Sequence, residues 1–140
     1  MAINPCDKCF HDFLLIINTN AHLLSNYILK LKIYFTDFWP NFRSEDNYFY
    51  NLLALKYDLE LNSNNPDVLF HSVDYFNKEG HLKYNNGFTK KIFFTGENID
   101  PVSVDTHFSL SFKQNSKQNY RLPLWTQYIN WFEKNDNILN

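Results

Sequence analysis

The chain has 140 residues and a formal net charge of −2, and 44% of its residues are hydrophobic. This length fits one ordinary domain, and an aromatic fraction of 19% supplies a buried core and argues against a disordered chain. Because positive charge is not in excess, the composition predicts no nucleic acid partner.

Residues 1–30 are predicted to form an N-terminal extension that is helical. The chain's two cysteines, Cys6 and Cys9, lie there in the pattern "CDKC". Such a pair can be a redox dithiol or half of a zinc site. His22 follows after twelve residues, but no second histidine comes three to five residues later, and His11 alone does not complete four ligands. We therefore favour two free thiols, and their role stays open.

The segment "FLLIINTNAHLLSNYIL" is the most apolar part of this extension. A membrane-spanning helix needs about 20 mostly apolar residues, and polar residues interrupt this run after five. A basic start followed by a small-residue cleavage site is also missing. The sequence therefore predicts no signal peptide and no clear transmembrane anchor, and favours a soluble, cytoplasmic location over the Golgi membrane. A helix that lies on the domain and the remnant of an anchor are the options that remain.

The first regular element is expected at residues 31–39, "LKIYFTDFW", where apolar residues alternate as in a strand. Ser44 is a candidate N-cap, and Tyr48, Leu52, Leu55 and Leu59 recur at helical spacing. This pattern predicts a helix over 45–57. A short strand follows in "LELN", residues 59–62.

The second half of the chain reads as short strands separated by loops. "PDVLFHSV" (66–73) contains an apolar run typical of a buried parallel strand, and 74–89 reads as loop with at most a short helix. Strands are expected in "KKIFFTG" (90–96) and "THFSLSF" (106–112), an extended piece in "RLPLW" (121–125), and a closing helix in "TQYINWFEK" (126–134). This order predicts an α/β, Rossmann-like layered domain with a mostly parallel sheet.

In parallel sheets, ligands bind beyond the carboxyl ends of the strands. Three of the expected strands end in polar and aromatic residues, at 36–39, 71–72 and 95–98. We expect these ends to meet at one cleft. Trp39, with Phe38, would give a sugar ring a flat apolar face, and Asn98 would hydrogen-bond a hydroxyl-rich ligand.

Glu97 is the sharpest catalytic candidate, because it follows a glycine at the end of a buried strand. There a carboxylate can be partly desolvated and can accept a proton from a hydroxyl nucleophile. The alternative is that Glu97 caps a loop or pairs with Lys90, Lys91 or Arg121. The sequence leaves both open.

Weaker candidates follow from the same strand ends. Asp37 would bind a ligand or cap the following helix, and the cap is favoured. His71 would face the cleft or serve as a structural histidine, whereas His107 lies at the start of a strand, away from the cleft. No phosphate loop, dinucleotide fingerprint, serine-hydrolase elbow or zinc-protease motif occurs, and no metal-ligand cluster is visible.

At these motifs the sequence resembles the N-terminal half of the family 10 glycosyltransferases, the α-1,3/4-fucosyltransferases. The matching pieces are "LKIYFTDFW", "PDVLFHS", "KKIFFTGENIDP" and "RLPLW". Their order and spacing agree over about residues 31–128, and the strand followed by "FTGEN" is the most specific. We therefore expect the domain to span 31–134, with 135–140 as a tail.

The resemblance implies a two-domain GT-B architecture with the active site between the halves. The N-terminal half would hold a glycan acceptor containing galactose or N-acetylglucosamine, and the C-terminal half GDP-fucose. Transfer would invert the anomeric centre, with Glu97 as the base. The sequence departs from the family at His107, where many members have an acid, and at Lys113, another position where an acid is common.

The sequence ends soon after these motifs. We therefore expect no cofactor to be bound by this half and no transfer by these residues alone, unless another chain supplies a donor domain. The exposed face would otherwise carry an apolar patch or be covered by self-association. The alternative is a non-catalytic glycan-binding or interaction module derived from the fold. The resemblance leaves the cellular location open, because animal relatives are anchored in the Golgi membrane and bacterial ones lack that anchor.

Overall fold

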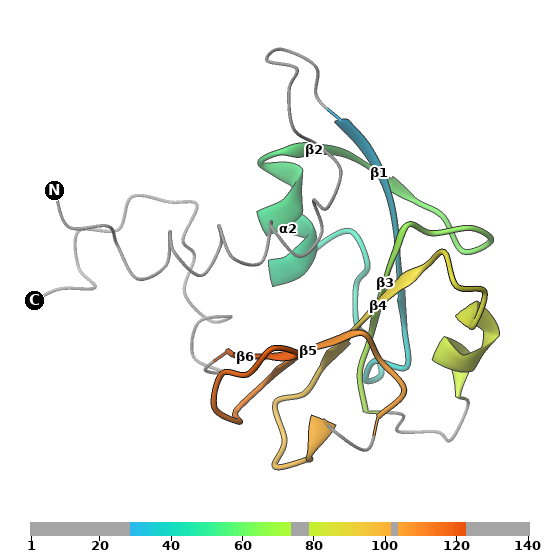
Figure 1. The fold of residues 1–140 in the computed structure, drawn as a ribbon. Helices are drawn as coiled ribbons and strands as arrows, with labels where there is room; N and C mark the ends of the chain where they lie inside the picture. The colour runs from blue at the N-terminus through green and yellow to red at the C-terminus, as the bar shows by residue number, and fades with distance from the viewer. Residues whose placement is uncertain (1–28, 74–78, 102–103, 123–140) are drawn as a thin grey trace, which may run out of the picture.

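The structure is a computed structural model that describes residues 29–73, 79–101 and 104–122. These ranges contain, in chain order, β1 (Leu29–Thr36), α2 (Tyr48–Ala54), β2 (Tyr57–Leu61), β3 (Val68–His71), the 3₁₀ helix η1 (Gly80–Tyr84), β4 (Lys90–Phe94), β5 (Phe108–Ser111) and β6 (Asn119–Arg121) (Figure 1). The elements confirm the predicted α/β class.

The described strands form one six-stranded sheet, ordered β2-β1-β3-β4-β5-β6, in which every pairing is parallel. Thr36 at the end of β1 lies opposite His71 at the end of β3, and His71 lies opposite Phe93 of β4. The carboxyl ends of these three strands therefore lie together at the same end of the sheet. The direction of strand addition reverses between β1 and β3, and such a switch point opens a ligand crevice.

One face of the sheet packs against α2 through aromatic rings. The ring of Phe70 in β3 stacks 5.1 Å from Phe35 in β1 and 5.2 Å from Phe49 in α2. Phe49 also meets Phe94 of β4 edge-on at 5.1 Å, and Leu53, one turn further along α2, is fully buried. Burying each of these side chains stabilises the fold by about 1.5–3 kcal/mol, so this cluster anchors the short helix.

The opposite face lies against the connection between β3 and β4. Tyr34 of β1 contacts Tyr84 of η1, with ring centroids 6.1 Å apart, and His71 stacks on His81 at 4.5 Å. Figure 1 shows α2 and η1 on opposite sides of the central strands. Because β3 is covered on both faces, its four residues are all buried, which explains the apolar run without alternation.

The predicted helix over 45–57 is wrong at both ends, and Ser44 is not its cap. Asn47 is the N-cap, since its side chain accepts a hydrogen bond from the backbone N–H of Tyr50 at 3.0 Å. Its amide also donates to the carbonyls of Arg43 and Ser44, at 2.9 and 3.1 Å, which holds the preceding turn. At the other end, Tyr57 begins β2, because parallel pairing with β1 takes it out of the helix.

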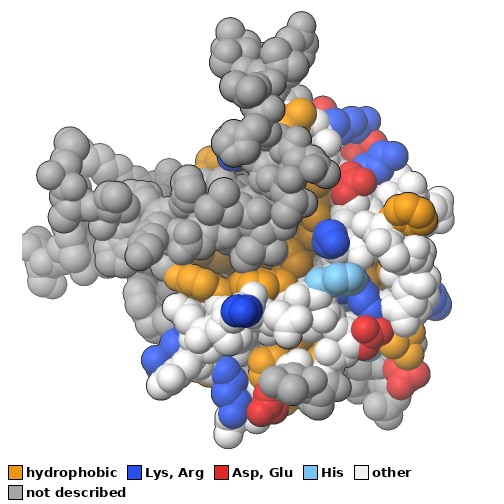
Figure 2. Space-filling model, viewed as in Figure 1, with side chains coloured by type: hydrophobic (Ala, Val, Ile, Leu, Met, Phe, Trp, Pro, Cys, Tyr) orange, Lys and Arg blue, Asp and Glu red, His pale blue; other side chains and the backbone are white. Residues whose placement is uncertain are grey.

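Several expectations fall on residues outside the described ranges. They concern most of the extension at 1–30 with Cys6 and Cys9, the closing helix at 126–134 and the tail at 135–140. Of "RLPLW", the structure describes the first two residues, and β6 ends at Arg121. Among the described residues, no helix is both long and apolar enough to cross a membrane. On the face shown in Figure 2, acidic and basic side chains are interspersed.

Candidate functional site at the carboxyl edge of the sheet

A cavity of about 470 Å³ opens at the carboxyl ends of β1, β3 and β4, beside the start of α2. It is lined by Trp39, Asn41, Phe42, Arg43, Asp46, Asn47, Tyr48, Phe49, Ser72, Val73, Phe94, Gly96 and Glu97. These residues come from the segment after β1, the start of α2, and the ends of β3 and β4. The structure thus brings the three predicted strand ends together at one cavity.

The floor of the cavity is aromatic. Trp39 meets Phe42 edge-on with ring centroids 5.2 Å apart, Phe38 at 5.4 Å and Phe94 at 6.5 Å, so three rings brace its indole. Trp39 nevertheless keeps 41% of its surface exposed, whereas Phe94 is buried. Ser72 closes the floor next to Phe94 by donating its Oγ–H to the Phe94 carbonyl at 2.8 Å. The result is a braced, solvent-facing aromatic ring.

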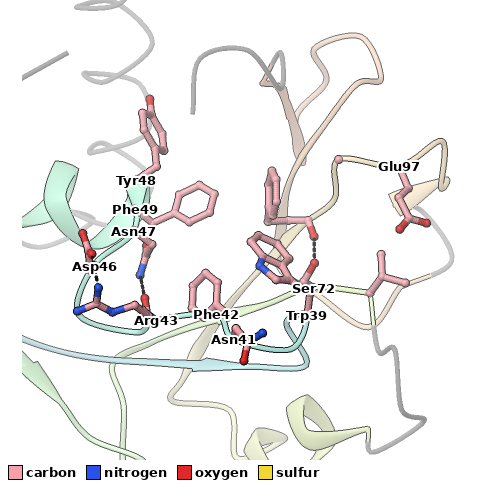
Figure 3. A pocket seen from close by; sticks show the side chains of 13 residues that line it. Trp39, Asn41, Phe42, Arg43, Asp46, Asn47, Tyr48, Phe49, Ser72 and Glu97 are labelled. Carbon is pink, nitrogen blue, oxygen red and sulfur yellow. Dashed lines mark hydrogen bonds and ion pairs between the residues drawn. The ribbon is translucent and has the colours of Figure 1, made fainter. Parts of the chain in front are cut away.

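Glu97 lines one side of the cavity. Figure 3 shows Arg43 and Asp46 on the other side, with Trp39 and Ser72 between. The turn after β4 fixes its backbone, since Glu97 N–H donates to Thr95 Oγ1 at 3.0 Å and its carbonyl accepts from Ile99 N–H at 2.8 Å. The residue is exposed, so this domain alone does not desolvate its carboxylate. The alternative in which Glu97 pairs with Lys91 is not seen. The Lys91 ammonium pairs with the Asp105 carboxylate instead.

The far rim of the cavity is polar. Arg43 and Asp46 form an ion pair at 2.9 Å, and both side chains remain largely exposed. Asn47, the cap of α2, lies beside them, as Figure 3 shows. Sequence reasoning missed these three residues, because they lie in an irregular turn whose position depends on the packing of α2. Arg43 and Asp46 add charged groups to the rim, whereas the Asn47 amide is used by its hydrogen bonds within the cap.

Of the other predicted site residues, Asn98 is exposed next to Glu97 but is not among the residues that line the cavity. Asp37 and His71 lie on the η1 side of the sheet. The Asp37 carboxylate accepts the backbone N–H groups of Gly80 and His81, each at 2.9 Å. Asp37 is therefore a cap, but of η1 rather than of the following helix. His107 lies away from the cavity, as predicted, and accepts the Lys91 N–H at 3.1 Å.

Burial governs the charges in this second cluster. It lowers the pKa of His71 to about 3, with His81 adding to the effect, so this imidazole is neutral near pH 7. For Asp37 burial works against ionisation, but hydrogen bonds from His81 and Gly80 outweigh it and hold the pKa of this carboxyl below its ordinary value. A carboxylate thus lies beside a neutral imidazole, and His81 Nδ1 lies 2.8 Å from Asp37 Oδ2.

Fold and site define an α/β domain with a parallel sheet and an aromatic-floored cavity at the strand-order switch point. The family model described as the α-(1,3)-fucosyltransferase FucT N-terminal domain matches residues 33–128, which is more than half of the chain. The chain therefore belongs to the α-(1,3)-fucosyltransferase N-terminal domain family, which confirms the resemblance found in its motifs.

Solved structures share this fold. An α1,3-fucosyltransferase is 22% identical with a TM-score of 0.57, an α1,3-fucosyltransferase with GDP-fucose 21% with 0.53, and one with GDP 21% with 0.51. Each match covers 81% of this chain but only 32–34% of the solved chain. The chain thus spans about a third of these proteins. A search of curated proteins found no match.

Proposed function

We propose that this domain is the acceptor-binding half of a GT-B fucosyltransferase, and that Glu97 is the general base for inverting transfer of fucose from GDP-fucose. The observation that carries the proposal is the shared cavity of Trp39 and Glu97 at the switch point of the sheet. Membership of the fucosyltransferase family and a solved relative with GDP-fucose support the donor and the reaction class.

The cavity suits a glycan acceptor that contains galactose or N-acetylglucosamine. The apolar face of a sugar ring would stack on Trp39, whose exposed indole is braced by Phe42 and Phe94. The charged rim residues Arg43 and Asp46 would hydrogen-bond the hydroxyls. Asn98, beside Glu97, would contact the acceptor once the ligand extends beyond the cavity.

In the proposed reaction, the Glu97 carboxylate accepts the proton of an acceptor hydroxyl. The hydroxyl oxygen forms a bond to the anomeric carbon of fucose while the bond from that carbon to GDP breaks, and GDP leaves with the electron pair. A positioned base contributes about 10²–10⁴ to such a rate. Because Glu97 is exposed in this half, the desolvation that would strengthen it as a base would come from closure of the donor half over the cavity.

The donor half has a separate task, which is to bind GDP-fucose and present it to the acceptor. Proximity and orientation account for a large share of such rates, so residues 1–140 by themselves would not transfer fucose. A donor domain in the same protein or on another chain would complete the site, or self-association would cover the exposed face. A glycan-binding module without catalysis is the alternative outcome.

Acceptor binding is tested by titrating the ¹⁵N-labelled chain with N-acetyllactosamine and following amide shifts by NMR. We expect Trp39→Ala to weaken binding about tenfold, because about 1.4 kcal/mol of apolar contact between the sugar face and the indole is lost. Phe88→Ala is the matched control, since Phe88 is 85% exposed and lies just before β4, at the opposite edge of the sheet. Absence of saturable binding, or equal effects of both variants, would contradict the proposal.

A further inference from the structure

A cluster of possible metal ligands lies on the η1 side of the sheet, outside the candidate acceptor site. Asp37 follows β1, His71 ends β3 and His81 lies in the first turn of η1. One ligand atom from each residue lies within 4.8 Å of the others. The residues come from segments up to 44 positions apart, so no motif spacing in the sequence indicates them.

The environment of His71 supports a bound ligand independently of the clustering. Its side chain is fully buried, and neither of its ring nitrogens has a hydrogen-bond partner among the described residues. Buried polar groups in folded proteins are nearly always paired, and an orphan imidazole points to a bound ion or an equivalent partner. Imidazole nitrogens are common metal ligands, so the unpartnered ring of His71 has the chemistry of a ligand at hand.

The Asp37 carboxylate is already oriented, as metal ligands usually are by their neighbours. Oδ1 accepts the N–H of Gly80 at 2.9 Å and the hydroxyl of Thr36 at 3.2 Å. Oδ2 accepts the N–H of His81 at 2.9 Å and lies 2.8 Å from His81 Nδ1. These contacts fix one ligand oxygen beside both imidazoles.

We propose that Asp37, His71 and His81 form a binding site for a divalent transition-metal ion, with Zn²⁺ as the best match. Two imidazoles and one carboxylate are a common ligand set for Zn²⁺, with solvent in the fourth position. The two rings are stacked with an angle of 14° between their planes, so their lone pairs do not point at one centre. Rotation of the His81 side chain, which is 15% exposed, would break its contact with Asp37 Oδ2, free a lone pair on that oxygen and bring the ring nitrogen into place.

The site would tie the ends of β1 and β3 to η1 and would act structurally. Trp39 follows Asp37 by two residues, and Ser72 follows His71 directly, and both line the acceptor cavity. A bound ion would therefore steady the floor of that cavity from behind. It would take no part in the transfer reaction.

The test is Zn²⁺ binding, measured by competition with a chromophoric chelator and by thermal unfolding. A Cys6→Ser/Cys9→Ser background removes the thiols, which could bind zinc elsewhere. We expect one Zn²⁺ per chain, a higher Tm with Zn²⁺, and at least about tenfold weaker binding in His81→Gln. His107→Gln is the matched histidine control and should bind as the background does.

Circular dichroism of the variant and the absorption spectrum of bound Co²⁺ complete the test. His81→Gln is preferred over His71→Gln because the His81 ring is partly exposed, and circular dichroism checks that it folds. Co²⁺ bound to the background chain should show ligand-field bands of nitrogen and oxygen ligands, and these bands should weaken in His81→Gln. The proposal is overturned if the background binds no Zn²⁺, if a folded His81→Gln binds as tightly, or if a His107→Gln variant that is folded by circular dichroism loses binding equally.

Discussion

The backbone N–H of Gly80 donates a hydrogen bond to Oδ1 of Asp37, at 2.9 Å and across 43 residues of sequence. Asp37 adopts a positive φ of 62°, and this rare conformation aims its carboxylate at η1. The contact fastens η1 to the end of β1, on the side of the sheet opposite the cavity that Trp39 and Glu97 line.

Gly80 is expected to tolerate no side chain. A Cβ at this position would clash with Thr36 Oγ1 and lie 2.7 Å from Asp37 Oδ1, both of which are held by hydrogen bonds. We predict that Gly80→Ala lowers the free energy of unfolding by about 1–3 kcal/mol, measured by urea denaturation. Lys83→Ala, at an exposed position of the same 3₁₀ helix, should change it by less than about 0.5 kcal/mol. Equal effects would contradict the packing seen at Gly80.

The N-cap of α2 is Asn47 in the structure, whereas the sequence pattern predicts Ser44. Asn47→Ala removes the acceptor of the Tyr50 N–H and the donor to two carbonyls, so we predict a loss of about 1–2 kcal/mol in the free energy of unfolding. Ser44→Ala, at the cap that the sequence predicted, should cost less than about 0.5 kcal/mol. Chemical denaturation of both variants decides, and a reversed order would restore the helix start at 45.

The comparison of sequence and structure shows which features are local. Phe70 and its neighbours in β3 form an apolar run that identifies a buried strand, and a parallel sheet follows from several such runs. The cavity at the carboxyl edge follows in turn, with Trp39 and Glu97 on it. The pairing of Asp37 with Gly80 and of His71 with His81 depends on where a connection folds back, which no local pattern encodes.

Lys91 is a buried cation whose partner is an exposed acid. Its side chain is 3% exposed and its Nζ lies 2.6 Å from Asp105 Oδ2, with Asn85 as second partner. Asp105→Asn should lower the free energy of unfolding by about 1–3 kcal/mol, since it leaves a buried charge without its counterion. Asp100→Asn is the control, because Asp100 and Lys113 are both exposed and 3.8 Å apart, and should cost less than about 0.5 kcal/mol.

The same ion pair predicts a pH dependence. The hydrogen bond from Lys91 lowers the pKa of Asp105 below its ordinary value, although burial opposes this. A lowered folded-state pKa contributes stability above the unfolded-state value of about 3.9, and this contribution disappears as pH falls through the folded-state value. The stability difference between the parent chain and Asp105→Asn should therefore be constant between about pH 7 and pH 5 and shrink below about pH 4. Unfolding curves at a series of pH values measure it, and a difference that grows in acid would refute the pair.

The proposed role of Glu97 is that of a base acting on an acceptor that Trp39 helps to hold. It is tested most directly in a fusion of this chain to the donor half of a solved α1,3-fucosyltransferase, by measuring fucose transfer to N-acetyllactosamine and acceptor binding on the same protein. We predict that Glu97→Gln lowers transfer at least about 10²-fold with little change in binding, whereas Glu45→Gln, an exposed acid outside the cavity, changes neither. Undiminished transfer by Glu97→Gln, or a parent fusion that binds both substrates without transfer, would contradict the account.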